Sequence, residues 1–169
     1  MQIRPGSIAD IPFFLHQESR EAFQGCIQSW SHAKHANSLI DPDKRYLIAE
    51  DEESIKVGYA IFSEFTSPHH ALYLQRLVVA EPGRGVGRRF FTALLDMAFG
   101  EWEKHRLWLH VFPDNQRARN FYLRYGFQEE GLHRDAVLMN GRFHSWISMA
   151  LLAPEWHGAE RRDSTLPEA

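Results

Sequence analysis

Cysteine and long apolar runs are scarce in this chain of 169 residues. The single cysteine, Cys26, cannot form a disulfide within the chain, and no residue near it suggests an activated nucleophile. No stretch approaches the roughly 20 apolar residues that span a membrane. The first residues, MQIRPGSIAD, also lack the apolar core of a signal peptide. These absences exclude a disulfide scaffold and predict a cytoplasmic protein without a membrane partner.

Excess charge of one sign and zinc-like spacing are lacking as well. The formal net charge is −3, which gives no basic field for nucleic acid, so we expect no nucleic-acid partner. Ten histidines are present. Pairs such as His32/His35 and His69/His70 have no third and fourth ligand at zinc-like spacing. We therefore expect no bound metal.

The composition is that of an ordinary folded domain, with 44% hydrophobic and 24% charged residues. We expect one domain over residues 1–152 and a polar, poorly ordered tail over 153–169. Alternating and β-rich apolar patterns predict strands at 3–4, 45–50, 57–65, 71–79, 106–112, from about 127 to 131 or beyond, and 146–151. Capping residues and helical periodicity predict helices from Ser7 or Asp10 onward and at 27–35, 86–104 and 115–125.

The order of these elements indicates the fold class. Helices come first, then several strands, and then strands alternate with helices. Asn140–Gly141 adds a strong hairpin-turn signal between the last strands. We therefore predict an α/β (α+β) domain with a mixed sheet.

A glycine-rich loop joins the strand at 71–79 to the helix after it. Gly83, Gly85 and Gly87 stand at every second position there, with arginines at 84, 88 and 89, and the unpaired N–H groups of a helix start can bind a phosphate. A Walker loop is excluded because no lysine and hydroxyl residue follow. A dinucleotide loop is excluded because Arg88 stands at its last glycine position. The loop therefore fits a phosphate-bearing ligand, and a tight strand–helix turn with solvated arginines is the alternative interpretation of the glycines.

A second segment narrows the function. Asn115, Ala118, Tyr122, Gly126 and Phe127 stand at fixed spacing after the strand at 106–112. The two segments together, in this order, resemble the GNAT superfamily of N-acetyltransferases, over about residues 1–152. The C-terminal part is similar to its ribosomal-protein and small-amine branches. The resemblance implies a twisted mixed sheet flanked by helices, with acetyl-CoA bound where two central strands splay apart.

The resemblance also implies roles for individual residues. Asn115 would contact acetyl-CoA, and Tyr122 would protonate the leaving thiolate. Backbone groups of Leu77, Val78 and Val79 would bind the pantetheine arm. The pyrophosphate would lie on the amides of Arg84, Gly85, Val86, Gly87 and Arg88. Pro82 departs from the family pattern because it offers neither an N–H nor a polar side chain, a loss for which Arg84 could compensate.

The general base is less clear from the sequence. Gln75 stands near the position where some family members have a carboxylate, and glutamine cannot take a proton. His110 occupies the position of a glutamate in the ribosomal-protein branch, and imidazole can act as a base at neutral pH. Glu64 or a chain of water molecules are the alternatives. Structural roles for His110 and Tyr122 also stay open.

The resemblance predicts an acetyl-CoA-dependent N-acetyltransferase. The acetyl group would pass directly to a primary amine of a small molecule or a protein N-terminus. Two other classes remain: a non-catalytic acyl-CoA-binding or sensing module, and a nucleotide-binding protein that uses the glycine loop. A homodimer is compatible with the sequence, which does not fix the oligomeric state.

Overall fold

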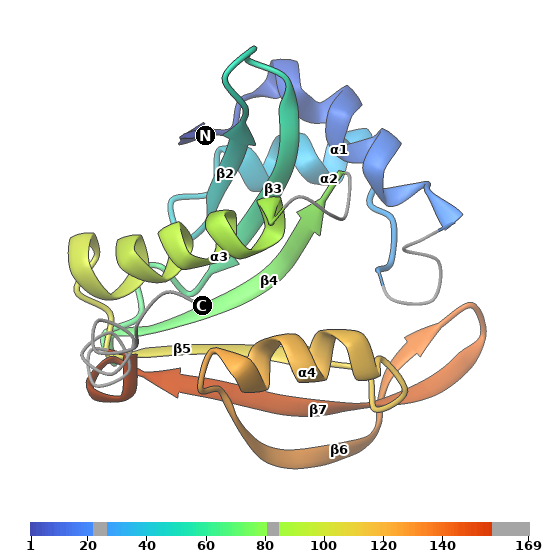
Figure 1. Cartoon of the computed structure of the whole chain (residues 1–169). Coiled ribbons are helices and arrows are strands. Elements are labelled where there is room, and N and C mark those ends of the chain that lie inside the picture. The colour runs from blue at the N-terminus through green and yellow to red at the C-terminus, as the bar shows by residue number, and fades with distance from the viewer. Residues whose placement is uncertain (22–26, 81–84, 157–169) are drawn as a thin grey trace.

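The computed structural model describes residues 1–21, 27–80 and 85–156. Seven strands form one sheet in the order β1-β2-β3-β4-β5-β7-β6 (Figure 1). The central strands β4 and β5 are parallel, and the other neighbours are antiparallel. The strands are β1 (Gln2–Pro5), β2 (Arg45–Glu50), β3 (Lys56–Ser63), β4 (Ala71–Val79), β5 (Arg106–Val111), β6 (Gln128–Met139) and β7 (Arg142–Leu152). The helical elements are η1 (Ile8–Asp10), α1 (Ile11–Glu18), α2 (His32–Leu39), α3 (Val86–Asp96), η3 (Met97–Glu101) and α4 (Gln116–Arg124).

The predicted mixed sheet with flanking helices is confirmed. Strands β2 and β4 have the bounds expected from their patterns. The β6–β7 hairpin turns at Asn140 and Gly141, whose φ angles of 50° and 74° give the left-handed turn that this dipeptide predicts. No helix in the described part of the chain is long and apolar enough to cross a membrane.

The second helix begins later than expected. Its predicted start was residue 27, whereas α2 begins at His32. The side chain of Ser31 accepts a hydrogen bond from the backbone N of Lys34 at 3.2 Å and caps the helix there. The indole of Trp30, just before the cap, packs in the core instead.

The third helix ends earlier than expected. The predicted span was 86–104, but α3 ends at Asp96 and the π-helical turn η3 follows. In this wider turn the backbone N of Trp102 bonds the carbonyl of Met97 at 2.8 Å. Glu103 then adopts a φ of 50°, and the chain turns into β5.

The predicted tail begins too early. Residues 153–156 form a helical turn, and Trp156 is only 7% exposed. Its indole packs near the ring of Tyr125, with 6.5 Å between the ring centroids. This apolar side chain therefore extends the folded part beyond residue 152, while residues 157–169 lie outside the described part.

Two apolar cores lie on opposite faces of the sheet. The larger core packs the sheet against α3 and α4, with Phe91 and Leu94 of α3 fully buried. The smaller core packs β2, β3 and β4 against α1, with Phe14 and Tyr59 fully buried. Figure 1 shows α3 and α4 on one face, with α1 and α2 on the other. Both faces are covered where β4 runs through the centre.

The central strands separate along their length. Strands β4 and β5 pair only from Ala71↔Arg106 to Tyr73↔Trp108. Beyond that point β4 curves away from β5, as Figure 1 shows. The divergence leaves one edge of β4, from residue 74 onward, without a neighbouring strand among the described residues.

A β-bulge lies at the point of divergence. On β3, Phe62 pairs with Leu74 and Ile61 pairs with Arg76, so Gln75 has no partner residue in this ladder. The extra residue reverses the facing of the side chains along β4. Leu74 packs in the larger core, and Arg76 lies on the opposite face against Trp30.

Candidate active site

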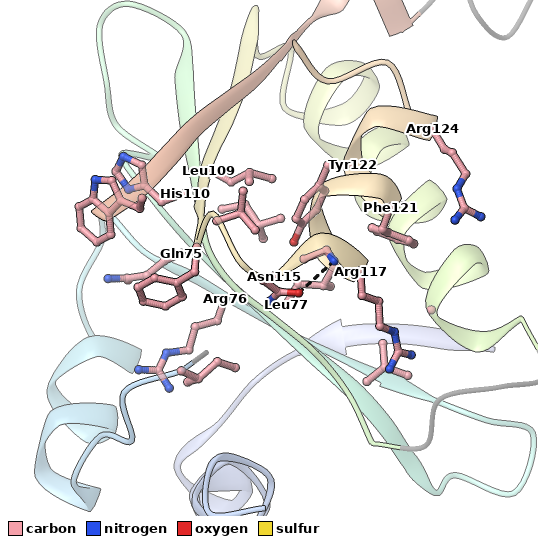
Figure 2. Close-up of a pocket in the computed structure, with 18 of the residues that line it drawn as sticks. Gln75, Arg76, Leu77, Leu109, His110, Asn115, Arg117, Phe121, Tyr122 and Arg124 are labelled. Atoms are coloured by element: carbon pink, nitrogen blue, oxygen red, sulfur yellow. Dashed lines mark hydrogen bonds between the residues drawn. The ribbon is translucent and has the colours of Figure 1, made fainter. Parts of the chain in front are cut away.

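A cavity of about 610 Å³ opens where β4 and β5 diverge (Figure 2). Its walls come mainly from β4, β5, the start of α3 and one side of α4, with Arg20, Ile27 and Trp146 of β7 also lining it. Most residues with a predicted role line it: Leu77, Val79, Gly85, Gly87, Arg88, His110, Asn115 and Tyr122. Val78 turns its side chain into the smaller core, and Val86 lies between two lining glycines. Arg84 and Pro82 lie outside the described residues.

The start of α3 forms one end of the cavity. Gly85 has a φ of 69°, a left-handed conformation that glycine adopts without strain. A Cβ on Gly87 would lie 3.3 Å from Cγ2 of Val79, so this glycine lets the helix approach β4 closely. The first N–H groups of the helix have no partner within it. This end of the cavity is therefore suited to an anion.

Asn115 precedes helix α4 as its N-cap residue, beside the cavity. The Oδ1 atom of Asn115 accepts a hydrogen bond from the backbone N of Ala118 at 3.1 Å, which caps the helix (Figure 2). Asn115 therefore has a structural role in addition to the predicted contact with acetyl-CoA.

Tyr122 lies about two turns after Asn115 along α4. Its ring packs against Phe91 and Phe127, each with 5.5 Å between centroids. Figure 2 shows its hydroxyl directed toward the cavity. Burial raises the pKa of this phenol, so it stays protonated at neutral pH. A protonated phenol at this place can donate a proton or a hydrogen bond.

His110 and Tyr122 both line the cavity, from opposite sides of β5 (Figure 2). Its ring stacks on Trp146 at 4.0 Å between centroids, with 7° between the planes. The hydroxyl of Tyr73 lies 3.2 Å from its Nδ1 atom. Burial, together with the charge of the nearby His133, lowers the pKa of His110 to about 4. The imidazole is therefore neutral at physiological pH.

Glu64, the alternative base, is turned away from this arrangement. One carboxylate oxygen accepts a hydrogen bond from the indole Nε1 of Trp108 at 2.9 Å. Trp108 in turn stacks on Tyr73. Glu64 is not among the described residues that line the cavity.

Comparison with known proteins identifies the family. A model of the acetyltransferase (GNAT) family matches residues 13–127. The chain belongs to the GNAT acetyltransferase family. Its predicted fold, its N-acetyltransferase class and its use of acetyl-CoA are thereby confirmed for this GNAT protein. The roles of individual residues stay predictions.

Named relatives agree with this family. The spermidine N(1)-acetyltransferase of Vibrio cholerae serotype O1 is 25% identical over 148 residues, which cover 87% of this chain and 83% of the relative. The ribosomal protein uS5-alanine N-acetyltransferase of Escherichia coli strain K12 is 28% identical over 120 residues, covering 70% of this chain and 57% of the relative. The crystal structure of spermidine N-acetyltransferase from Vibrio cholerae in complex with CoA and spermine has the same fold, with a TM-score of 0.81 at 21% identity, covering 92% and 97% of the two chains.

Several residues of this GNAT cavity were not predicted from the sequence. Trp146 comes from β7 and reaches the cavity through its stack on His110. Arg117 and Arg124 project from the exposed side of α4. Arg117 and Arg124 are seven residues apart, and this helical spacing could have indicated that they share one side of α4. No local sequence pattern could have predicted Trp146 at the cavity, because its contact with His110 depends on the pairing of β7 with β5.

Arg76 connects the GNAT cavity to a buried charged network. Its guanidinium forms an ion pair with Glu18, whose side chain is fully buried. Glu18 also accepts hydrogen bonds from the Tyr59 hydroxyl and the backbone N of Trp30, both at 2.8 Å. The Nε2 atom of His35 lies 3.2 Å from the same carboxylate. Burial alone would raise the pKa of Glu18, but His35, Arg76 and these donors lower it below its usual range.

Metal ligands are not gathered in the described part of this GNAT protein. No three His, Cys, Asp or Glu side chains there form a group that could hold an ion. The expectation of no bound metal stays a prediction.

Proposed function

We propose that the protein transfers the acetyl group of acetyl-CoA directly to a primary amine within the cavity between β4 and β5. The acceptor is an amine of a small molecule or of a protein N-terminus, as in the spermidine and ribosomal-protein acetyltransferases that the chain resembles. The observation that carries this proposal is the pairing of two features across one cavity: an anion-binding helix start and the protonated Tyr122. One cysteine in the chain suits the reducing cytoplasm as the location.

Acetyl-CoA would lie along the open edge of β4. Its pyrophosphate would accept hydrogen bonds from the amides of Gly85, Val86, Gly87 and Arg88 at the start of α3, and from Arg84 in the preceding loop. Arg117 and Arg124 on α4 add positive charge beside this end. The pantetheine amides would pair with backbone groups of Leu77, Val78 and Val79. Those groups lie beyond the last residue pair that β4 shares with β5.

The reaction needs no covalent intermediate on the protein. The neutral amine attacks the thioester carbonyl and forms the C–N bond, while the carbonyl oxygen becomes an oxyanion. A backbone N–H group of β4 near the Gln75 bulge would stabilise that oxyanion. The C–S bond then breaks, and the departing thiolate takes the proton of the Tyr122 hydroxyl. The products are the N-acetylated amine and CoA.

His110 fits a late proton transfer in this sequence. An imidazole with a pKa of about 4 is too weak a base to deprotonate a free ammonium group, whose pKa is about 10.4. The nitrogen becomes far more acidic once it is bonded to the carbonyl carbon. We propose that His110 accepts the proton at that stage, through the ring nitrogen that does not face Tyr73.

Thermal unfolding with acetyl-CoA, followed by a thiol-release assay with primary amines, tests the proposal. Acetyl-CoA at 100 times its dissociation constant should add about 2.7 kcal/mol, a rise in Tm of roughly 5–11 °C. ATP at the same concentration should give a much smaller rise. Thiol release should depend on the amine, and mass spectrometry should find the acetylated product.

Two outcomes would contradict the proposal in different ways. No rise in Tm with acetyl-CoA would remove the cofactor site. A rise without thiol release for any amine would instead identify a non-catalytic acyl-CoA-binding module.

A further inference from the structure

The two ends of the cavity differ in charge. Arg88, Arg117 and Arg124 line the end where CoA is proposed to lie. The other end carries Gln75, Arg76 and His110, with Phe112 and Trp146 beside them. No aspartate or glutamate is among the described residues that line either end. An acceptor with several ammonium groups would therefore find no carboxylate counterion among the described lining residues.

The charge of Arg76 does not change this conclusion. Its guanidinium pairs with the buried Glu18 and also donates to the carbonyl of Gln28. The buried carboxylate of Glu18 thus neutralises the positive charge of Arg76. Any ammonium group at this end would meet the like charge of Arg76. The carboxylate of Glu18 is already paired with that arginine.

Gln75 offers a neutral hydrogen-bond acceptor to an amine. Its side-chain oxygen Oε1 is buried and has no hydrogen-bond partner among the described residues. A buried polar atom without a partner is costly, so a ligand that donates to it gains affinity. Gln75 also stands at the bulge, on the same side of the cavity as His110 (Figure 2). An amine N–H is a donor of the right kind for this oxygen.

Aromatic rings line the same end of the cavity as Gln75. His110 and Trp146 stack in parallel at 4.0 Å, and His110 is neutral at physiological pH. Phe112 adds a further ring on the same strand as His110. Such a wall favours a planar apolar group next to the amine.

We propose that the acceptor is a primary amine with a flat apolar substituent and no second positive charge, and that Gln75 positions its nitrogen by accepting an N–H. This inference rests on the proposed function and deepens it by naming the class of acceptor. Such an acceptor differs from spermidine and spermine, the amines named for the similar acetyltransferases.

The test compares phenethylamine with spermidine in the thiol-release assay at saturating acetyl-CoA. The wild-type protein should have a kcat/KM for phenethylamine at least about tenfold above that for spermidine, because each additional ammonium group lacks a counterion. Gln75→Leu should raise the KM for phenethylamine by about 3–10-fold, the value of one hydrogen bond, with a smaller change in kcat. Gln75→Glu should shift the preference toward spermidine.

Gln128→Leu is the matched control. It makes the same change on the exposed β6, where the side chain bonds Glu155 far from the cavity wall. Its kinetic constants should equal those of the wild type. The rise in Tm with acetyl-CoA, measured for every variant, shows that each one folds and binds the cofactor.

The outcomes separate this inference from the proposed function. If acetyl-CoA raises Tm and spermidine is the better acceptor, the inference is wrong and the proposed function stands. An unchanged KM in Gln75→Leu, or no turnover of phenethylamine, would also overturn it. If acetyl-CoA does not raise Tm of the wild type, the proposed function itself fails.

Discussion

At the scale of single residues, Tyr122 combines a packed ring with a hydroxyl that faces the cavity. Tyr122→Phe keeps the ring and removes the proposed proton donor. We expect kcat to fall by about 10²–10⁴-fold, the range for a general acid, while the Kd of acetyl-CoA stays unchanged. Thiol-release kinetics and calorimetry measure the two quantities.

Tyr46→Phe is the control for the loss of a buried tyrosine hydroxyl. That hydroxyl bonds Nδ1 of His35 at 3.2 Å and does not line the cavity. Its kcat should stay within about twofold of the wild type. An equal loss in both variants would assign Tyr122 a purely structural role.

The pKa of His110 gives a second test at this scale. Burial and the charge of His133 lower it to about 4, so the ring should stay neutral from about pH 5.5 to pH 8. The NMR signal of the His110 ring, assigned with His110→Gln, should therefore not shift over this range. A titration midpoint near pH 6.5 would show that the ring is less shielded from water than its stack on Trp146 indicates.

At the scale of elements, Gly58 sets how closely β3, β4 and α3 approach. A Cβ there would lie 2.7 Å from the carbonyl oxygen of Val78 and 3.4 Å from the ring of Phe90. Gly58→Ala must move the β4 edge or the start of α3, and both form the proposed acetyl-CoA site. We expect a loss of about 1–3 kcal/mol in the free energy of unfolding and a weaker Kd for acetyl-CoA.

Gly131→Ala in β6 is its control. A Cβ there meets nothing within 4 Å, so both stability and acetyl-CoA affinity should change little. Denaturant unfolding and calorimetry give the two values. Wild-type affinity in Gly58→Ala would show that the cavity does not depend on this close approach.

Elements whose signals are local were predicted well from the sequence. The alternating pattern of β4, the Asn140–Gly141 turn and the cap at Asn115 depend on neighbours within a few residues, and the structure has them. The family motif also led to residues that line one cavity. Local chemistry therefore accounts for most of the strands and for the residues at the proposed cofactor end of the cavity.

Features that depend on distant residues were not predicted. The bulge at Gln75 exists because two residues of β3 face three of β4, which no local pattern records. The packing of Trp30 beneath Arg76, just before the Ser31 cap of α2, is likewise a contact between distant segments. We expected Trp156 in the tail because polar residues follow it in the sequence. Its side chain packs in the core instead.

At the scale of the whole molecule, the Glu18 network ties α1, the segment before α2 and the central strand together. Glu18→Gln would leave the buried charge of Arg76 without its partner. We expect a loss of about 3–5 kcal/mol in the free energy of unfolding at pH 7. Glu130→Gln is the control, because Glu130 pairs with Arg106 at the surface and such pairs are worth about 0–1 kcal/mol.

The same network predicts how stability depends on pH. The pKa of Glu18 is lower in the folded protein than in the unfolded chain, so its stabilisation is present above about pH 4.3 and is lost as the pH falls through the lowered pKa. Urea unfolding between pH 7 and pH 3 should show a smaller acid-induced loss in Glu18→Gln than in the wild type. Identical pH profiles would contradict the charged role of Glu18.

The short pairing of β4 with β5 has a mechanical consequence. Three residue pairs join one half of the sheet to the other, and the ring of Phe91 adds contacts across the same boundary to Phe121 and Tyr125. In the proposed complex, acetyl-CoA lies between the two halves and bonds the edge of β4 as a neighbouring strand would. The substrate would then complete the sheet at each turnover, and product release would return the molecule to two halves joined by a narrow hinge.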